Sequence, residues 1–163
     1  MLAGIAVVVH VLLVFWLVAG IVGRDVCARQ ARAATELAAI REIAAVGSRF
    51  EMAMVRPATG AVLIAGLIAA WARGWPILGF LQGSPINWVL ASLLIYLTII
   101  PVIVFVFLPR RKIYHQALEN AIAAGTITPE LRKALHDPWV AAGRRYELVM
   151  IATLTFFMVT RPF

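Results

Sequence analysis

Cysteine is nearly absent from this chain of 163 residues, in which Cys27 is the only one. A single thiol cannot form a disulfide within the chain. A structural metal site needs several ligands, and redox chemistry usually pairs two thiols. The cysteine content therefore excludes a disulfide framework and gives no support to a thiol-based metal site.

Charge is also missing from long parts of the sequence. Hydrophobic residues make up 63% of the chain, and its mean hydropathy is +0.91. A soluble domain is nearer half apolar, whereas a helix of about 20 apolar residues spans the hydrocarbon core of a bilayer. Four stretches meet that description, at about residues 2–23, 49–73, 87–109 and 138–160. The sequence therefore predicts one all-α domain over residues 1–163, a four-helix transmembrane bundle with cytoplasmic helical extensions.

Acidic residues are scarce, with eight against 15 Lys and Arg. Five of the basic residues lie in 24–51 and five in 109–137, whereas 72–87 contains Arg73 alone. Because cytoplasmic loops carry the excess of Lys and Arg, we expect both basic loops in the cytoplasm and both termini outside. Contact with the lipid bilayer suits these loops, so no nucleic-acid role is expected. Arg outnumbers Lys 13 to 2, as in GC-rich bacterial genomes, which points to a bacterial inner membrane.

Proline and glycine are absent from residues 24–46, an Ala-rich segment that we interpret as an amphipathic helix, either continuous with the first span or separate from it. Gly47 is expected to end this helix. Ser48 and Glu51 then have the spacing of a capping box that would start the second span. Pro57 lacks an N–H and is expected to kink that span. Thr128-Pro129 and Asp137-Pro138 predict the starts of a short helix and of the fourth span.

Five ionisable side chains are expected just inside the same membrane edge: Glu51, Arg56, Arg144, Arg145 and Glu147. A bilayer tolerates such groups when they are paired, snorkelling or functional. One interpretation is a set of structural ion pairs, in which Arg56 binds Glu147. In the same set, Glu51 binds Arg145. The alternative is a polar vestibule that guides a proton or binds an anionic group, such as a lipid phosphate or a haem propionate, because the planar guanidinium binds two oxygens. The arginines of the loops, Arg24 included, are interpreted as anchors.

His10 is expected about 12 Å below the outer end of its helix. It could be a neutral, hydrogen-bonded histidine, and the hydroxyl groups at a suitable depth belong to Ser92, Tyr96, Thr153 and Thr155. Alternatively, it could be an axial ligand of haem b or a copper ligand, with Arg144 and Arg145 at an anionic substituent.

Motifs along the whole chain resemble a bacterial family of predicted integral membrane proteins, domain-of-unknown-function family 2269. The C-terminal motif combines Trp139-x-x-x-Gly143 with an apolar run that closes on Met158-Val159-Thr160-Arg161-Pro162. Members typically close on Met-Val-x-Lys-Pro, so Arg161 replaces the usual lysine. Further matches are His10 with Trp16, Thr59-Gly60, Trp88, Tyr96 and Pro101. The resemblance to this family therefore implies no particular activity.

The first span has a looser likeness to two other groups of membrane proteins. Its pattern of His10, Trp16, Ala19-Gly20 and Arg24 is similar to that of haem-binding protoporphyrinogen oxidases and of copper-resistance D-type proteins. From the sequence we favour a membrane subunit or accessory protein over an enzyme, packing through small residues against its own copies or other membrane subunits. The rival hypotheses are a haem-associated oxidoreductase and a protein that handles copper or another small ion.

Overall fold

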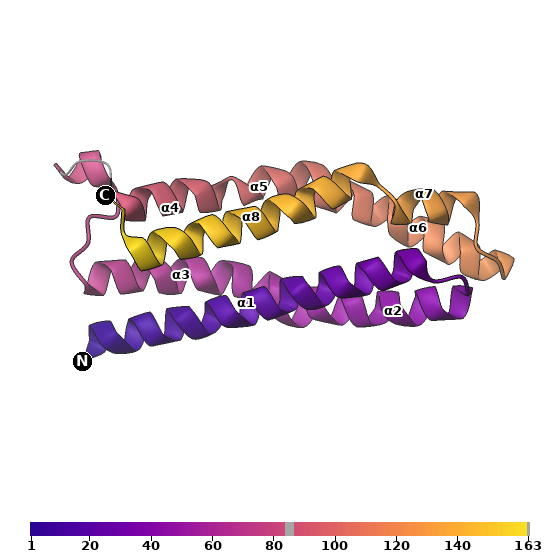
Figure 1. The fold of residues 1–163 in the computed structure, drawn as a ribbon, viewed down its shortest axis with the longest axis horizontal. Coiled ribbons are helices and arrows are strands. Elements are labelled where there is room, and N and C mark those ends of the chain that lie inside the picture. The colour runs from indigo at the N-terminus through magenta and orange to yellow at the C-terminus, as the bar shows by residue number, and fades with distance from the viewer. Residues whose placement is uncertain (84–86, 163) are drawn as a thin grey trace.

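The computed structural model describes residues 1–83 and 87–162, and every regular element in those ranges is helical (Figure 1). The α-helices are α1 (Leu2–Ala33), α2 (Leu37–Phe50), α3 (Arg56–Ala72), α4 (Trp88–Leu97), α5 (Ile99–Val102), α6 (Leu108–Ala124), α7 (Pro129–Leu135) and α8 (Pro138–Thr160). Two π-helical segments, η1 (Glu51–Val55) and η3 (Ile103–Phe107), and a 3-10 helix, η2 (Gly79–Gln82), complete the set. The all-α prediction is confirmed over these residues.

Four long helical rods build the molecule. The first is α1, the second joins α2, η1 and α3, the third runs from α4 to α6, and the fourth is α8. Leu2–Ala33, Leu37–Ala72 and Trp88–Ala124 are long and apolar enough to cross a membrane. Helix α8 has 23 residues, but it is not one of these candidate membrane spans because it contains three charged residues. Three candidate spans are thus established, and the fourth stays a prediction.

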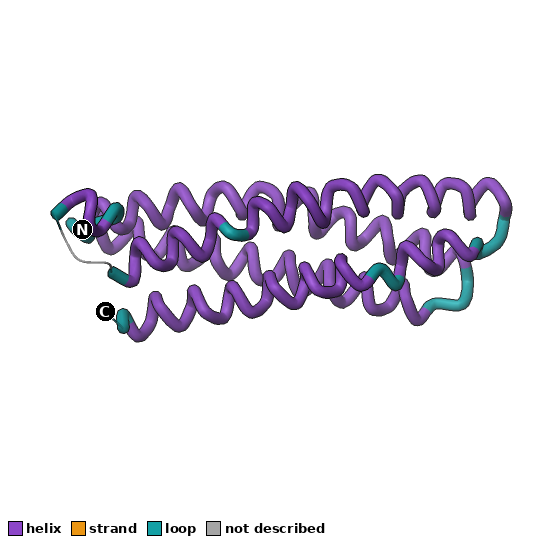
Figure 2. Tube along the Cα trace, turned by 90° about the horizontal axis from the view of Figure 1, so that it is seen from above, coloured by secondary structure: helices purple, strands orange, loops and turns teal. Residues whose placement is uncertain are grey.

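The rods are arranged in two layers, with α1 to α3 in one and α4 to α8 in the other (Figures 1 and 2). Both termini lie at one end of the molecule, and the turns after α1 and α6 lie at the opposite end. Helix α1 has 32 residues and is therefore about 48 Å long, which exceeds the roughly 30 Å of a hydrocarbon core. Helix α1 is therefore longer than a helix needs to be to cross a membrane.

The helical extensions have a small apolar core of their own. Its buried members come from α2, α6 and α7: Ile40, Ala117, Leu118, Ala121 and Leu131. A second buried cluster joins α1 to η1 and α3, and a third joins α5 to α8. The extensions are thus a packed layer rather than loose connections between the spans.

The predicted helix break at Gly47 is wrong, because Leu37–Ala72 is one continuous helical rod. Gly47 instead lies against Cys27, where an added Cβ would stand 3.3 Å from the Cβ of that cysteine. Ser48 and Glu51 do not form a capping box, since Glu51 lies within the rod and its carboxylate binds arginine side chains. The actual break falls after Ala33, where the backbone of Ala34 is extended.

The two π-helical segments each end two residues before a proline, at Pro57 and Pro109. A proline in a helix offers no N–H to the carbonyl four residues earlier, and π-helical turns are a recognised way to absorb such a defect. The disturbance expected at Pro57 therefore takes the form of a π-helical segment. Its counterpart before Pro109 was not expected.

The two predicted N-caps at the far end of the molecule are confirmed. The Thr128 hydroxyl accepts a hydrogen bond from the backbone N–H of Leu131 at 3.3 Å. The Asp137 carboxylate accepts hydrogen bonds from the backbone N–H groups of Trp139 and Val140 at 2.8 and 3.3 Å. These caps fix where α7 and α8 begin, and so set which side chains of α8 face the other layer.

Candidate functional site: a cavity between the two layers

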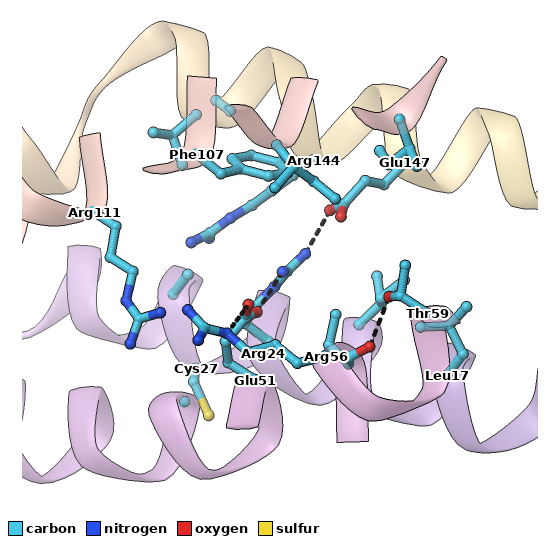
Figure 3. A pocket seen from close by; sticks show the side chains of 18 of the residues that line it. Leu17, Arg24, Cys27, Glu51, Arg56, Thr59, Phe107, Arg111, Arg144 and Glu147 are labelled. Atoms are coloured by element: carbon cyan, nitrogen blue, oxygen red, sulfur yellow. Dashed lines mark hydrogen bonds and ion pairs between the residues drawn. The ribbon is translucent and has the colours of Figure 1, made fainter. Parts of the chain in front are cut away.

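Arg24 of α1 is the central charged residue between the layers (Figure 3). Its Nη1 donates to Oε2 of Glu51 in η1 at 2.7 Å, and its Nη2 donates to Oε2 of Glu147 in α8. Its guanidinium also lies 5.6 Å from the centre of the Phe107 ring in η3. One side chain therefore connects all four rods.

The ion pairs differ from those expected from the sequence. Glu147 binds Arg24 and not Arg56, whose Nε lies 3.4 Å from Glu51 instead. The predicted pair of Glu51 with Arg145 is also wrong, because Arg145 is exposed and makes no ion pair within the described part of the chain. Glu147 is only 4% exposed, which explains why it needs a close partner.

Sequence reasoning missed Arg24 as a member of this cluster. Its position directly after an apolar run looks like that of an anchor at the membrane edge. The signal that could have identified it is α1 itself, which continues nine residues beyond Arg24 and so keeps this side chain between packed helices. Asp25 was missed as well, and it lies 3.8 Å from Nη1 of Arg144.

A cavity of about 500 Å³ surrounds this cluster. Among the described residues that line it, six are arginines: Arg24, Arg32, Arg56, Arg110, Arg111 and Arg144. Three carboxylates also line it: Glu51, Asp137 and Glu147. When arginines are counted against carboxylates, this end of the cavity has an excess of three positive charges among its described lining residues. In a site partly shielded from water, such an excess favours a negatively charged occupant.

The other end of the same cavity is apolar. Its lining there includes Val14 and Leu17 of α1 together with Met150, Leu154 and Met158 of α8. Arg144 and Met158 are 14 residues apart on α8, which corresponds to about 21 Å along the helix. The cavity is therefore amphipathic, with a cationic end and a long apolar end.

The lining arginines fall into two groups by the partners they already have. Arg24 binds two carboxylates, Arg56 lies beside Glu51, and Nε of Arg110 lies 3.2 Å from Asp137. These three charges are compensated within the protein.

The remaining arginines of the lining have weaker partners. Nε of Arg111 donates to Nε2 of His115 at 3.3 Å, and Nε of Arg32 donates to the carbonyl of Ala28 at 3.2 Å. Arg144 has only the 3.8 Å approach to Asp25. Two guanidinium groups in the described lining are thus left without a carboxylate partner, and a third has only a long ion pair.

Both π-helical segments contribute to the walls of this cavity. Glu51 and Val55 come from η1, and Ile103 and Phe107 come from η3. Segments of this kind occur frequently at functional sites, because they change the direction of side chains within an otherwise regular helix. Here the two segments place a carboxylate and an aromatic ring on either side of Arg24.

His10 lies outside the lining of the cavity. Its Nδ1 donates a hydrogen bond to the carbonyl of Val62 in α3 at 3.1 Å, so its partner is none of the hydroxyl groups expected. The ring packs against Gly66, where an added Cβ would stand 3.0 Å from Cε1 of the histidine. The interaction joins α1 closely to α3.

The parts of the hypothetical haem site are not brought together. Arg144 lines the cavity, His10 packs between α1 and α3, and Arg145 is exposed. Within the described residues, no three side chains of His, Cys, Asp or Glu gather in a way that could hold a metal ion. The arrangement suits the binding of an anion better than the binding of a haem or copper.

Three apolar rods long enough to cross a bilayer, with charge gathered inside the molecule, define an integral membrane protein. The family model described as predicted integral membrane protein, domain of unknown function 2269, matches residues 5–162, and the chain belongs to this family. No curated protein and no solved structure matches the chain significantly. The likeness to haem-binding and copper-resistance proteins thus rests on a few residues of the first helix alone.

Proposed function

We propose that this integral membrane protein is a non-catalytic binding or accessory protein, whose cavity takes up an anionic lipid from the surrounding bilayer. The headgroup would lie among the arginines near Arg24, and the tail would lie along the apolar wall formed by α1 and α8. The observation that carries this proposal is the combination of a cationic end and an apolar end in one cavity. Its volume of about 500 Å³ is within the usual range for small-molecule sites.

A transmembrane position of α8 is part of the same proposal. Glu147 is buried, and Arg144 faces the cavity. Charges directed into the protein are compatible with a helix that crosses the bilayer, whereas charges directed at lipid are costly. Arg145, which is exposed, can snorkel to the headgroup region if it lies near the membrane edge.

We also propose an orientation in the membrane, which is supported by the distribution of basic residues. We place the arginine-rich end on the cytoplasmic side of a bacterial inner membrane and both termini outside, because the basic loops flank that end. Small residues on α3, such as the exposed Gly60, offer a surface for a second copy or another membrane subunit. The protein would then supply a bound lipid, or a lipid-dependent contact, to a larger membrane assembly.

The test is a lipid titration of the purified protein in a mild non-ionic detergent, followed by thermal unfolding. Dioctanoyl phosphatidylglycerol should raise the melting temperature, because a ligand at 100 times its Kd stabilises the folded state by about 2.7 kcal/mol. Dioctanoyl phosphatidylcholine, with the same tails and no net charge, should have a much smaller effect.

Two adjacent arginines on α8 provide the matched variants. Arg144→Gln removes a charge from the cavity lining and should weaken the effect of the anionic lipid. Arg145→Gln removes the same charge from an exposed position and should leave the effect unchanged. The lipid would act outside the cavity if both lipids stabilised the wild-type protein equally. The same conclusion would follow if both variants lost the same amount of stabilisation by the anionic lipid.

A further inference from the structure

We propose that the headgroup bound in this cavity carries at least two negative charges, as a phosphate monoester or a diphosphate on a lipid tail does. This inference rests on the proposed function and specifies the class of lipid. Its basis is the difference between the arginines that have carboxylate partners and those that do not.

Charge compensation is the first step. The cationic end has three more arginines than carboxylates among its described lining residues. A phosphodiester headgroup carries a single negative charge and would leave most of that excess uncompensated. Because uncompensated charge is costly where water is partly excluded, a headgroup with two or three charges is a better complement.

The available donors are the second step. Arg32 and Arg111 line the cavity without an ion pair among the described residues. Arg144 has one long ion pair, at 3.8 Å from Asp25, so the three weakly paired arginines come from α1, α6 and α8. Each guanidinium can bind two oxygens in a fork, which is the geometry that a terminal phosphate with three free oxygens can satisfy. A phosphodiester offers only two free oxygens and would leave some of these guanidinium N–H donors without an acceptor.

The position of these donors is the third step. Figure 3 shows Arg111 and Arg144 on the side of the cavity opposite Cys27 and Glu51, with their guanidinium groups directed into the space between the layers. The Nε–H of Arg24 is also buried there without a hydrogen-bond partner among the described residues. An anion among these groups would therefore meet donors from more than one direction.

A lipid suits the cavity better than free phosphate does, since the lining continues from the arginines along an apolar wall. From Arg144 to Met158 this wall follows α8 for about 21 Å, which is longer than the roughly 15 Å acyl region of one leaflet. Inorganic phosphate or glycerol phosphate would leave it unfilled. The tail therefore supplies binding energy that a soluble phosphate lacks.

The experiment compares three probes on the detergent-purified protein: dioctanoyl phosphatidic acid, dioctanoyl phosphatidylglycerol and glycerol 3-phosphate. At pH 8 we expect phosphatidic acid to bind at least about tenfold more tightly than phosphatidylglycerol, as one more charge-assisted hydrogen bond would give. Glycerol 3-phosphate should not displace it. The preference should shrink at pH 5.5, because a phosphate monoester loses its second charge below about pH 6.

Arg111→Gln and Lys112→Gln form the matched pair of variants on α6. Arg111 lines the cavity and Lys112 is exposed, so only Arg111→Gln should reduce the preference for phosphatidic acid, to less than about threefold. Equal affinities of the wild-type protein for the two anionic lipids would overturn this inference and leave the proposed function intact. Equal affinities for anionic lipids and phosphatidylcholine would overturn both, and displacement by glycerol 3-phosphate would overturn the assignment to a lipid.

Discussion

The two halves of the chain are both built from long antiparallel helices, but they are packed differently. In the half formed by α1 to α3, glycines stand where helices approach closely: an added Cβ on Gly20 would lie 2.7 Å from the Cβ of Met54, and one on Gly23 would lie 2.7 Å from the Phe50 ring. In the half formed by α4 to α8, the corresponding glycine is Gly143, where an added Cβ would lie 2.8 Å from the Phe107 ring. Tight packing by small residues is thus concentrated in the N-terminal half.

Polar contacts and a cavity lie at the boundary between the halves, beside the apolar core that joins α2 to α6 and α7. Arg24 bridges the boundary through Glu147, and the Tyr96 hydroxyl donates to the carbonyl of Thr59 at 2.5 Å. The cavity lies along the same boundary. The comparison shows that close packing at glycines is a feature of the N-terminal half. The two halves are joined by the apolar core of the extensions and, around the cavity, by polar contacts.

The largest expected effect comes from removing the charge that joins the halves. Arg24→Gln leaves Glu147 buried without its counter-ion, which should lower the free energy of unfolding by about 3–5 kcal/mol. Arg145→Gln, an exposed charge on α8, should change it by less than about 0.5 kcal/mol. Thermal and denaturant unfolding in detergent measure both values.

A double-mutant cycle isolates the contact between Arg24 and Glu147. The two changes should be non-additive by about 0.5–3 kcal/mol, as expected for residues in direct contact. The same cycle with Arg145 in place of Arg24 should be additive. Additivity in the first cycle would mean that the two halves are joined by something other than this pair.

A smaller effect is expected from disturbing the packing within the N-terminal half. Gly20→Ala forces an added methyl group against Met54 and Val55 and should cost about 1–3 kcal/mol of stability. Gly4→Ala on the same helix has nothing within 4 Å of the added Cβ and should not destabilise the protein. If both changes gave the same melting temperature, the close approach of α1 to the second rod would be refuted.

The smallest expected effect concerns the hydrogen bond between the halves on the apolar side of the cavity. Tyr96→Phe removes the donor to Thr59 and should lower stability by about 0.6 kcal/mol, a typical value for hydrogen bonds between helices in a membrane. Among the described residues, the Thr153 hydroxyl donates to the carbonyl of Val149 within its own helix, so Thr153→Val is a suitable control. Unchanged unfolding of Tyr96→Phe relative to this control would show that the bond adds nothing to the contact between the halves.

Much of the fold could be predicted because its determinants are local. Apolar runs, the Thr128 and Asp137 caps and the scarcity of charge each act within one helix, and the structure contains the elements that they predict. The helix break at Gly47 was wrong because tertiary packing against Cys27 outweighs the low helix propensity of a glycine. Local signals therefore described the helices well but not where each rod ends.

The candidate site could be predicted only in part, since it depends on which helices face one another. Glu51, Arg56, Arg144 and Glu147 do line one cavity. Their partners could not be derived, because a single sequence does not reveal that α1 brings Arg24 between Glu51 and Glu147. His10 illustrates the same limit: its acceptor is a backbone carbonyl, which every residue carries and no side-chain pattern can identify.

The π-helical segments before Pro57 and Pro109 change the helical phase partway along the second and third rods. One extra residue in a helix rotates everything beyond it by about 100° around the axis. The side of a rod that is buried among the apolar spans can therefore differ from the side that is buried in the extension. The backbone remains helical throughout. The second and third rods can each pack into two buried clusters. The change of phase falls at η1 and η3, whose residues line the cavity.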